Sequence, residues 1–338
     1  MGKIHQTHLR GKYFLMTIKK IAIQMDAIEI IDLDFDTSFL LAMEAQQRGY
    51  EVFYYNPIDL EYDKSVVQAW GYFIELFDQK NAHFKYKSEK KELLNLAEVD
   101  VVLIRQDPPF DMNYISSTYL LEQLPSSKVV LNNPVSIRNA AEKIYPFQFQ
   151  EYIPPTIITQ KIETIKKFLI ENEDIVTKPL YGNGGEGIFR SKIDDSILQG
   201  IDESKNILDE PIMAQKYIPE IAEGDRRIIL IDGEYVGSVA RIPQPNKLKA
   251  NFHAGGQPQK TDLIYRDKEI CDALKKDLKE KNLFLVGIDT IGNYLTEINV
   301  TSPTGLKQIN ELNDVNLEKV YWDKLEAKFF EPLNILRG

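Results

Sequence analysis

Cysteine is almost absent from this chain of 338 residues, and the single Cys271 excludes an internal disulfide. A lone thiol fits a reducing compartment. Long apolar runs are also missing: none approaches the roughly 20 residues of a membrane helix, and the apolar patch near the N-terminus is too short for a secretory signal. We therefore expect a cytoplasmic protein without a membrane partner, in which residues 1–17 form a loose leader.

Positive charge is the second thing in short supply. The 41 Lys and Arg are outnumbered by 51 Asp and Glu, and the net charge of −10 argues against nonspecific binding to nucleic acid. Local basic clusters around an anionic ligand are compatible with that balance. The hydrophobic content of 43% and a length sufficient for two or three domains indicate a globular protein with sizeable cores.

The first third of the chain has the pattern of a βαβ unit. Strands are expected at Ile18–Met25 and Glu51–Tyr55, with a helix between them, and Val99–Arg105 is a further buried strand. In α/β sheets, ligand groups gather at the carboxyl ends of the strands, so Arg105 and Asp107 are candidate substrate ligands. A proline-stiffened crossover is the alternative interpretation of that loop.

A glycine-rich loop follows a strand in the middle of the chain. The strand is Ile175–Pro179, which carries Lys178, and residues 181–187 (YGNGGEG) place four glycines within six positions. The backbone N–H groups of such a loop can converge on an anion, and the lysine adds a point charge. The spacing matches neither a GxGxxG motif before a helix nor a Walker loop. A glycine hairpin without function is the alternative.

Two strands near the C-terminus, Phe284–Asp289 and Tyr294–Val300, flank a short turn. Residues two apart in a strand share a face, so Glu297 and Asn299 present oxygens together. Asp289 joins them if the turn has three residues or contains a bulge, whereas a two-residue turn puts Glu297 on the other face. Three hard oxygens suit Mg²⁺ bound through nucleotide phosphates, and an acidic hairpin facing solvent is the alternative.

Other polar groups extend this candidate site. A second hairpin carries Arg227 and Arg241, whose planar guanidinium groups suit phosphate or carboxylate. The aperiodic segment 243–257 is too long for a tight turn and is a candidate lid, within which His253 is more often incidental than catalytic. The hydroxyl-rich turn 301–305 has backbone N–H groups that could hold a carboxylate.

Together these segments resemble an ATP-grasp ligase, and most closely the prokaryotic-type glutathione synthetase family. The resemblance runs from about residue 18 to residue 330. The glycine loop and the C-terminal hairpin are common to the superfamily, whereas RQDPPFD and NVTSPTG are specific to this family. The resemblance rests on six strings: RQDPPFD (105–111), KPLYGNGG (178–185), GDRRIILIDG (224–233), ARIP (240–243), AGG (254–256) and TEINVTSPTG (296–305).

The resemblance implies an α/β fold, α+β in part. It is an ATP-grasp fold with an N-terminal Rossmann-like parallel-sheet domain (18–137) that binds substrate, a small lid subdomain (138–216) and a C-terminal catalytic subdomain (217–330). The implied reaction is the ATP-dependent ligation of γ-glutamylcysteine and glycine through an acyl phosphate, giving glutathione, ADP and phosphate. The implied cofactor is Mg²⁺, for which Mn²⁺ can substitute, and the implied assembly is a homotetramer.

The site residues that the resemblance implies lie in the motifs described above. The nucleotide phosphates would contact Lys143 and Lys178 under the loop of Gly182, Asn183, Gly184 and Gly185. The adenine edge would be lined by Gln215, Lys216, Tyr217 and Ile218, with Asp225 near the ribose. The acyl phosphate would face the catalytic Arg227 and Arg241, the metal would be held by Asp289, Glu297 and Asn299, and a substrate carboxylate would face Ser302 and Thr304.

Two positions depart from the family's pattern. Lys249 stands where an arginine is common, and Gln257 stands where another basic residue is expected. Both lie in the candidate lid, so the departures bear on lid closure rather than on the reaction.

Two other functions fit part of the pattern. Another ATP-grasp ligase, such as a D-alanine–D-alanine ligase, would share the nucleotide site and use a different acid, and the RQDPPFD string argues against it. A nucleotide-binding regulatory protein in the manner of synapsin would bind ATP without ligating anything. The presence of Glu297, Asn299, Arg227 and Arg241 argues against that alternative.

Overall fold

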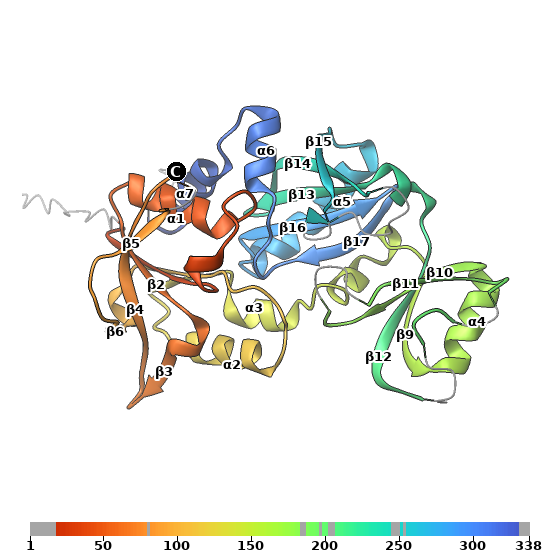
Figure 1. Ribbon diagram of the computed structural model, residues 1–338, viewed down its shortest axis with the longest axis horizontal. Coiled ribbons are helices and arrows are strands. Elements are labelled where there is room, and N and C mark those ends of the chain that lie inside the picture. Colours follow the sequence, from red (N-terminus) through yellow and green to blue (C-terminus); the bar gives the residue numbers. More distant parts are fainter. Residues whose placement is uncertain are drawn as a thin grey trace, which may run out of the picture.

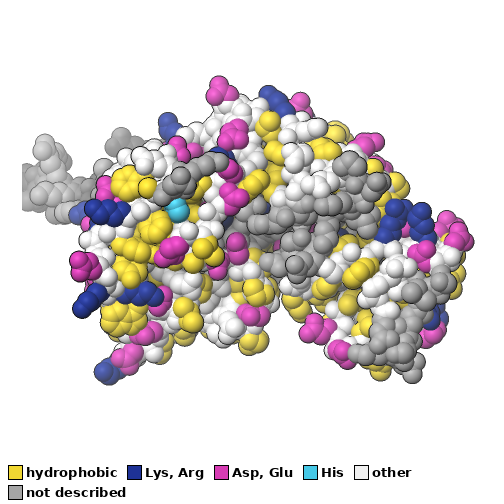
Figure 2. Space-filling model, in the orientation of Figure 1, with side chains coloured by type: hydrophobic (Ala, Val, Ile, Leu, Met, Phe, Trp, Pro, Cys, Tyr) yellow, Lys and Arg dark blue, Asp and Glu magenta, His cyan; other side chains and the backbone are white. Residues whose placement is uncertain are grey.

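Three β-sheets follow one another along the chain, each with helices packed against it (Figure 1). The structure is a computed structural model that describes residues 18–79, 82–182, 187–195, 198–201, 207–244, 251–252 and 255–330. Within these ranges, no helix is long and apolar enough to span a bilayer. On the face shown in Figure 2, basic side chains stand singly or in small groups among acidic ones.

The first sheet is parallel at its centre, with the strand order β3-β4-β2-β1-β7-β8. Its parallel strands are β1 (Lys20–Gln24), β2 (Glu51–Tyr55), β7 (Val101–Ile104) and β8 (Val129–Leu131). These strands are predominantly apolar because helices cover both faces. The helices are α1 (Thr37–Gln47) on one face, and α2 (Met112–Leu121) with α3 (Pro134–Asn139) on the other. The predicted βαβ unit is confirmed.

An antiparallel extension of this sheet occupies residues 59–95, where the sequence has strand-like patches with charged interruptions and allows no firm assignment. It consists of β3 (Leu60–Asp63), β4 (Val66–Leu76), β5 (Phe84–Tyr86) and β6 (Glu92–Asn95). The long β4 pairs with each of the other three. The charged residues that interrupt the pattern, such as Glu61, Glu75 and Glu92, are exposed, because the strands of this extension are only partly covered.

The second sheet is antiparallel, in the order β11-β10-β12-β9. Its strands are β9 (Thr156–Lys161), β10 (Asp174–Pro179), β11 (Phe189–Lys192) and β12 (Ile207–Lys216). The amphipathic pattern of the sequence predicts a helix over Ile162–Asn172, and helix α4 occupies these residues. It packs Ile165 and Phe168 against the sheet. In Figure 1 this sheet and its helix stand apart at the right.

The sequence pattern over Glu142–Gln150 predicts an α-helix, and this prediction is wrong. Residues Tyr145–Tyr152 form 3-10 turns, and Phe149 has non-helical dihedral angles (φ −123°, ψ 51°). Tyr145, Phe149 and Tyr152 still pack against the core of the third sheet. Pro154 and Pro155 follow this stretch and end it.

The third sheet has the order β15-β14-β13-β16-β17. Its strands are β13 (Asp225–Ile231), β14 (Glu234–Ile242), β15 (Gln257–Lys260), β16 (Leu285–Ile291) and β17 (Tyr294–Asn299). Along β13, Ile228 packs toward α5 (Tyr265–Glu280), while Ile229 belongs to the core formed with α6 (Leu306–Asn313) and α7 (Leu317–Phe329). Alternate residues therefore face opposite layers. Helices α6 and α7 were not predicted from the sequence.

The first and third sheets are joined at their edges. The Asn132 side chain, just after β8, donates to Leu285 O (2.8 Å) and Val300 O (2.7 Å) and accepts from the N–H groups of Phe284 (2.7 Å) and Leu285 (2.9 Å). On the other side, Trp322 of α7 packs on α1 and donates to Leu41 O at 2.9 Å. These contacts fix the parallel sheet beside the third sheet.

Candidate active site

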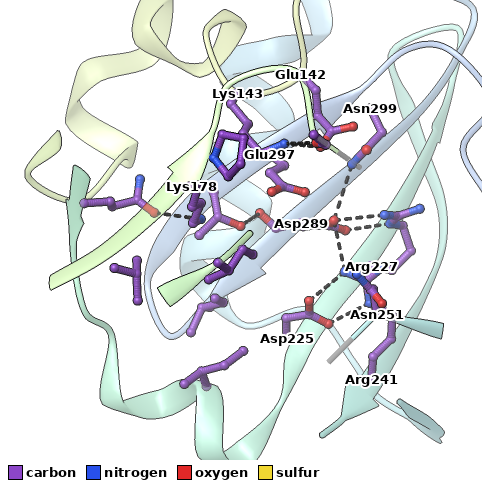
Figure 3. Close-up of a pocket in the computed structure, with 18 of the residues that line it drawn as sticks. Glu142, Lys143, Lys178, Asp225, Arg227, Arg241, Asn251, Asp289, Glu297 and Asn299 are labelled. Atoms are coloured by element: carbon purple, nitrogen blue, oxygen red, sulfur yellow. Dashed lines mark hydrogen bonds and ion pairs between the residues drawn. The ribbon is translucent and has the colours of Figure 1, made fainter. Parts of the chain in front are cut away.

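A cavity of about 540 Å³ lies between the second and third sheets (Figure 3), and the loop that follows β7 of the first sheet forms a further wall. Its walls come from the loop after β7, from β10 and β12, and from β13, β14, β16 and β17. The cavity brings together most of the residues predicted from the sequence. They are Asp107, Lys143, Lys178, Gly182, Gln215, Lys216, Tyr217, Ile218, Asp225, Arg227, Arg241, Asp289, Glu297, Asn299, Ser302 and Thr304.

A row of charged side chains crosses one face of the third sheet inside this cavity. Asp225 of β13 is the register partner of Arg241 on β14, Arg227 of β13 is that of Asp289 on β16, and Asp289 is in turn opposite Glu297 on β17. Since residues two apart in a strand share a face, the pairing itself places all five on one side. We call Asp225, Arg227, Arg241 and Asp289 the arginine–aspartate cluster.

The arginine–aspartate cluster is buried and internally paired. Asp289 accepts from Arg227 Nε at 2.6 Å and Nη2 at 2.9 Å, and it lies 3.0 Å from Arg241 Nη2. Arg241 holds Asp225 through two further hydrogen bonds of 2.7 and 2.6 Å. Burial alone would raise the pKa of Asp289, but the charges of Arg227 and Arg241 outweigh it and lower the pKa below its usual value. The cluster therefore contains two cations that carboxylates already neutralise.

The bulged register, one of the two left open by the sequence, is the one present in the C-terminal hairpin. A bulge between Asp289 and Thr290 sets Asp289 opposite Glu297, and Asn299 Nδ2 donates to Asp289 Oδ2 at 3.3 Å. The described residues contain no group of three His, Cys, Asp or Glu suited to a metal. A metal site here therefore needs the amide oxygen of Asn299, and two carboxylates with one amide form a hard-oxygen set that fits Mg²⁺.

Two buried lysines lie near these carboxylates (Figure 3). Lys143 Nζ donates to Gly182 O at 2.6 Å, and Lys178 Nζ donates to Gln215 Oε1 at 3.1 Å. Burial lowers the pKa of Lys178. Burial also acts to lower the pKa of Lys143, but neighbouring carboxylates outweigh it and raise the value. Two ammonium groups in one cavity favour an anionic ligand.

Glu142 is a cavity residue that the sequence reasoning missed. Its carboxylate lies 3.3 Å from Lys143 Nζ and close to Glu297 (Figure 3). Burial, and then the charge of Glu297, raise the pKa of Glu142 to about 8. The available signal was its position directly before Lys143, an acid beside a predicted phosphate ligand.

Part of the predicted nucleotide site lies outside the described residues. This applies to Asn183, Gly184 and Gly185 of the glycine loop and to Lys249 and His253 of the predicted lid. Gln257, at the other end of that segment, begins β15 and pairs with Ile242 of β14. The lid itself stays a prediction.

The turn after β17 connects the cavity with the first sheet. Thr304 O accepts from Arg227 Nη1 at 3.0 Å, and Pro303 O accepts from Arg105 Nη2 at 3.1 Å. Arg105 lines a second, smaller cavity instead of the large one, whereas Asp107 lines both. Of the two predicted substrate ligands, Asp107 therefore borders the large cavity and Arg105 does not.

This arrangement is suited to binding a polyphosphate and stabilising the charge of a phosphoryl group in transfer. Such a transfer depends on positioned cations and preorganised donors more than on an acid–base pair. Lys143, Lys178, Arg227 and Arg241 supply the cations within one cavity. The chain has the parts needed to activate a carboxylate by phosphorylation.

Comparisons with known proteins agree with the geometry. Residues 19–138 match the family model of the prokaryotic glutathione synthetase N-terminal domain, and residues 142–314 match that of the prokaryotic glutathione synthetase ATP-grasp domain. The glutathione synthetase of Agrobacterium fabrum is 42% identical over 312 residues, which cover 92% of this chain and 97% of the relative. That of Vibrio parahaemolyticus is 40% identical over 312 residues, covering 91% and 98%.

Solved structures of the same fold are more distant in sequence. A D-cycloserine synthetase has a TM-score of 0.62 at 12% identity, covering 92% of this chain and 99% of its own. D-alanyl-alanine synthetase A from Vibrio cholerae has a TM-score of 0.59 at 15% identity, covering 93% and 99%. An ATP-grasp ligase bound to its precursor peptide and AMPPNP has a TM-score of 0.59 at 14% identity, covering 93% and 99%. These likenesses concern the fold alone, and they confirm the predicted ATP-grasp architecture.

Proposed function

The chain belongs to the prokaryotic glutathione synthetase family, and we propose that its cavity of about 540 Å³ is where it performs that family's reaction. The reaction is the ATP-dependent ligation of γ-glutamylcysteine to glycine through an acyl phosphate, which yields glutathione, ADP and phosphate. One observation carries the placement: the arginine–aspartate cluster and two buried lysines line the same cavity.

The nucleotide, in this proposal, lies between the second and third sheets. Its phosphates contact Lys143 and Lys178, whose burial strengthens their attraction for anions. The loop of Gly182, Asn183, Gly184 and Gly185 covers the phosphates, and the adenine edge lies along Gln215, Lys216, Tyr217 and Ile218. Asp225 is placed near the ribose, although it is engaged by Arg241, so a ribose contact requires some exchange of partners.

Asp289, Glu297 and Asn299 are the proposed ligands of Mg²⁺, and Mn²⁺ is another hard cation that the same oxygens accept. Such a cation, when bound, neutralises phosphate charge and polarises the phosphoryl group. The three side chains fit this role because the bulged register sets them on one face. Asp289 must then give up part of its contact with Arg227 and Arg241.

The acid and amine substrates meet beside the arginine–aspartate cluster. A carboxylate and an amine do not condense in water, so the carboxylate is first phosphorylated, with Arg227 and Arg241 holding the acyl phosphate. The enclosing walls keep water from this intermediate. The turn with Ser302 and Thr304 holds the glycine carboxylate, and an amine substrate with a side chain would have to displace those contacts.

Three broader assignments complete the proposal. The N-terminal substrate domain covers residues 18–137, the lid subdomain 138–216 and the catalytic subdomain 217–330. The chain acts in the cytoplasm as a homotetramer, as the family resemblance implies. Analytical ultracentrifugation of the purified protein tests the assembly directly.

The decisive experiment measures the reaction. With Mg²⁺ and ATP, the protein should release ADP in proportion to added γ-glutamylcysteine and glycine, and glutathione should appear by mass spectrometry. ATP binding without ADP release would favour a regulatory protein, and use of D-alanine in place of glycine would favour another ligase.

Glu297→Gln should reduce turnover on the order of 100-fold or more, because an anionic ligand is lost while shape is kept. The free energy of unfolding should change far less. Glu311→Gln, the same substitution at an exposed position of α6, is the control and should behave as wild type. Near-normal turnover of Glu297→Gln would place the metal elsewhere.

A further inference from the structure

The turn of residues 301–305 lies against the third sheet, and its first four residues line the large cavity. Two arginines hold the backbone of this turn. Thr304 O accepts from Arg227 Nη1 at 3.0 Å, and Pro303 O accepts from Arg105 Nη2 at 3.1 Å. These hydrogen bonds fix the carbonyl groups of the turn, and a separate contact with the sheet sets how close the turn lies to the strands.

That contact is with Gly287 of β16. Gly287 is buried, is the register partner of Asn299 on β17, and lies two residues before Asp289, so it shares the face of the sheet that carries the charged row. A Cβ atom at Gly287 would lie 2.9 Å from Pro303 Cβ. Carbon atoms in contact are normally about 3.5–4.0 Å apart. The turn can therefore lie this close to the sheet only because position 287 has no side chain.

Arg227 occupies the remaining space over Gly287. The same added Cβ atom would lie 3.2 Å from Arg227 Cδ and 3.3 Å from Arg227 Nη1. A Cβ atom at Gly305, at the end of the turn, would lie 3.3 Å from Arg227 Cγ. Gly305 has a φ of 118°, which glycine adopts without strain. Two glycines thus leave room for the side chain of Arg227 beneath the turn.

A methyl group at position 287 would press on the turn more than on Arg227. The guanidinium of Arg227 is fixed by two hydrogen bonds to Asp289, and its two contacts with the added atom are the longer ones. The contact with Pro303 is the shortest, and ordinary contact there requires a shift on the order of 0.5 Å. The two hydrogen bonds of the turn can lengthen by this amount, so we expect the turn to move away from the sheet.

We infer that Gly287 is a positioning residue for the amine substrate, because it lets the turn lie at the depth at which the turn holds the glycine carboxylate. The inference rests on the proposed function, in which that carboxylate binds at the turn while the amine attacks the acyl phosphate beside Arg227 and Arg241. The length of glycine fixes the distance between these two ends. The height of the turn above the sheet therefore decides whether the amine reaches the acyl carbon. Gly287 itself lies outside the lining of the cavity.

The first test is Gly287→Ala, assayed with saturating ATP and γ-glutamylcysteine. A misplacement of about 1 Å can cost on the order of 100-fold, so a smaller shift of the turn should lower kcat/KM for glycine roughly 10-fold. The KM for glycine should rise, and the KM values for ATP and γ-glutamylcysteine should stay near wild type. The displaced turn faces the cavity and not the core, so the variant should fold.

Hydroxylamine separates the amine site from the activation of the acid. Its nitrogen attacks the acyl carbon of the acyl phosphate, phosphate leaves, and a hydroxamate forms. Hydroxylamine has no carboxylate for the turn to hold. Gly287→Ala should therefore form the hydroxamate of γ-glutamylcysteine at nearly the wild-type rate, whereas a general disturbance of the active site would reduce glutathione and hydroxamate alike.

A second variant tests the contact from the other side. Pro303→Gly removes the Cβ atom that the alanine would meet and adds no atom, so it does not crowd the fold. It leaves the turn less supported, and should lower kcat/KM for glycine by a smaller factor with hydroxamate formation unchanged. In the Pro303→Gly background, Gly287→Ala should cost almost nothing further, because the two effects act through one contact.

Gly237→Ala is the matched control, on the neighbouring strand order of the same sheet and outside the cavity lining. A Cβ atom at Gly237 of β14 would lie 2.6 Å from Ile309 Cγ2 of α6 and 3.3 Å from Leu317 Cδ1 of α7. The substitution therefore crowds the packing of the helices at least as much. It should lower the free energy of unfolding and leave kcat/KM for glycine near wild type.

The outcomes separate the inference from the function beneath it. The inference is overturned, with the ligase function intact, if Gly287→Ala uses glycine as well as wild type or loses hydroxamate formation to the same extent. It is also overturned if Gly287→Ala costs as much in the Pro303→Gly background, or if Gly237→Ala has the same effect on glycine. If the wild-type protein forms neither glutathione nor hydroxamate, the proposed function falls, and the inference with it.

Discussion

Two groups of buried arginines in this molecule differ in whether a carboxylate neutralises their charge. Arg227 forms a bidentate pair of hydrogen bonds with Asp289, and Arg241 forms one with Asp225. Arg105, on the other side of the Ser302–Thr304 turn, donates to neutral oxygens and has no ion pair within the described ranges. All three are almost fully removed from solvent.

The difference indicates how each site meets its ligand. Where ion pairs already neutralise the arginines, the ligand-free folded protein carries no unpaired buried charge there. A ligand then binds by replacing the carboxylate partners of the arginines. Where a guanidinium is left uncompensated, the folded state carries the desolvation penalty until a ligand arrives. A substitution in the site of Arg227 and Arg241 should therefore lower the free energy of unfolding even without ligand. The site of Arg105 should add to the free energy of unfolding mainly when substrate is bound.

Breaking the paired site should have the largest effect. Asp289→Asn removes the carboxylate shared by Arg227 and Arg241, and should lower the free energy of unfolding by about 3–5 kcal/mol, because buried cations lose their partner. Urea denaturation of ligand-free protein measures it. Turnover should be lost as well.

A second ion pair, between buried Asp267 and partly buried Arg226, provides the control for that variant. Asp267 holds Arg226 by two hydrogen bonds of 2.7 and 3.0 Å on α5, away from the large cavity. Asp267→Asn should destabilise by a comparable amount and leave the turnover of the folded fraction near normal. Equal loss of turnover in both variants would mean that Asp289 has only a structural role.

Substrate binding should produce the next largest effect. At about 100 times its Kd, γ-glutamylcysteine should stabilise the wild-type protein by about 2.7 kcal/mol through mass action. The same concentration should stabilise Arg105→Met by far less, because the carboxylate of the substrate loses its cation. Urea denaturation with and without substrate gives both values, and identical stabilisation would contradict a role for Arg105 in binding.

The smallest effect is expected for Arg105→Met without ligand. Its loss of two hydrogen bonds to neutral oxygens is offset by the removal of an uncompensated charge, so the free energy of unfolding should change by less than about 1 kcal/mol. The measurement compares this change in the free energy of unfolding with the larger change expected for Asp289→Asn. If Arg105→Met costs as much as Asp289→Asn, the two arginine sites are not different in kind.

The candidate metal ligands of the C-terminal hairpin could be found from the sequence, because the spacing of residues along a strand is local information. Glu297 and Asn299 lie two apart, and the bulged hairpin was one of two registers that the turn allowed. The bulge that decides between those registers lies between Asp289 and Thr290, and the spacing of the residues alone does not show it. The role of these residues as metal ligands stays a prediction.

The second cavity was beyond the sequence reasoning for a different reason. The sequence predicts Thr37 or Ser38 as the N-cap of α1, whereas the structure has Asp36 there. Nothing local indicates that Arg105, 67 residues from Ser38, will donate to it. Glu142 was missed in the same way, because its neighbour Glu297 comes from a distant strand. Local pattern identifies elements and turns, and sheet packing decides which charges meet.

Asp289 also couples the affinity of the cavity for a metal cation to its affinity for a phosphate. If Asp289 binds the metal as we propose, the cation frees Arg227 and weakens the hold on Arg241, which Asp225 also binds, so that both can contact a phosphate. An anion that draws the arginines away in turn exposes Asp289 to the cation. Linkage requires the factor to be the same in both directions. The site should therefore hold metal weakly on its own, bind phosphate weakly on its own, and bind the two together with positive cooperativity.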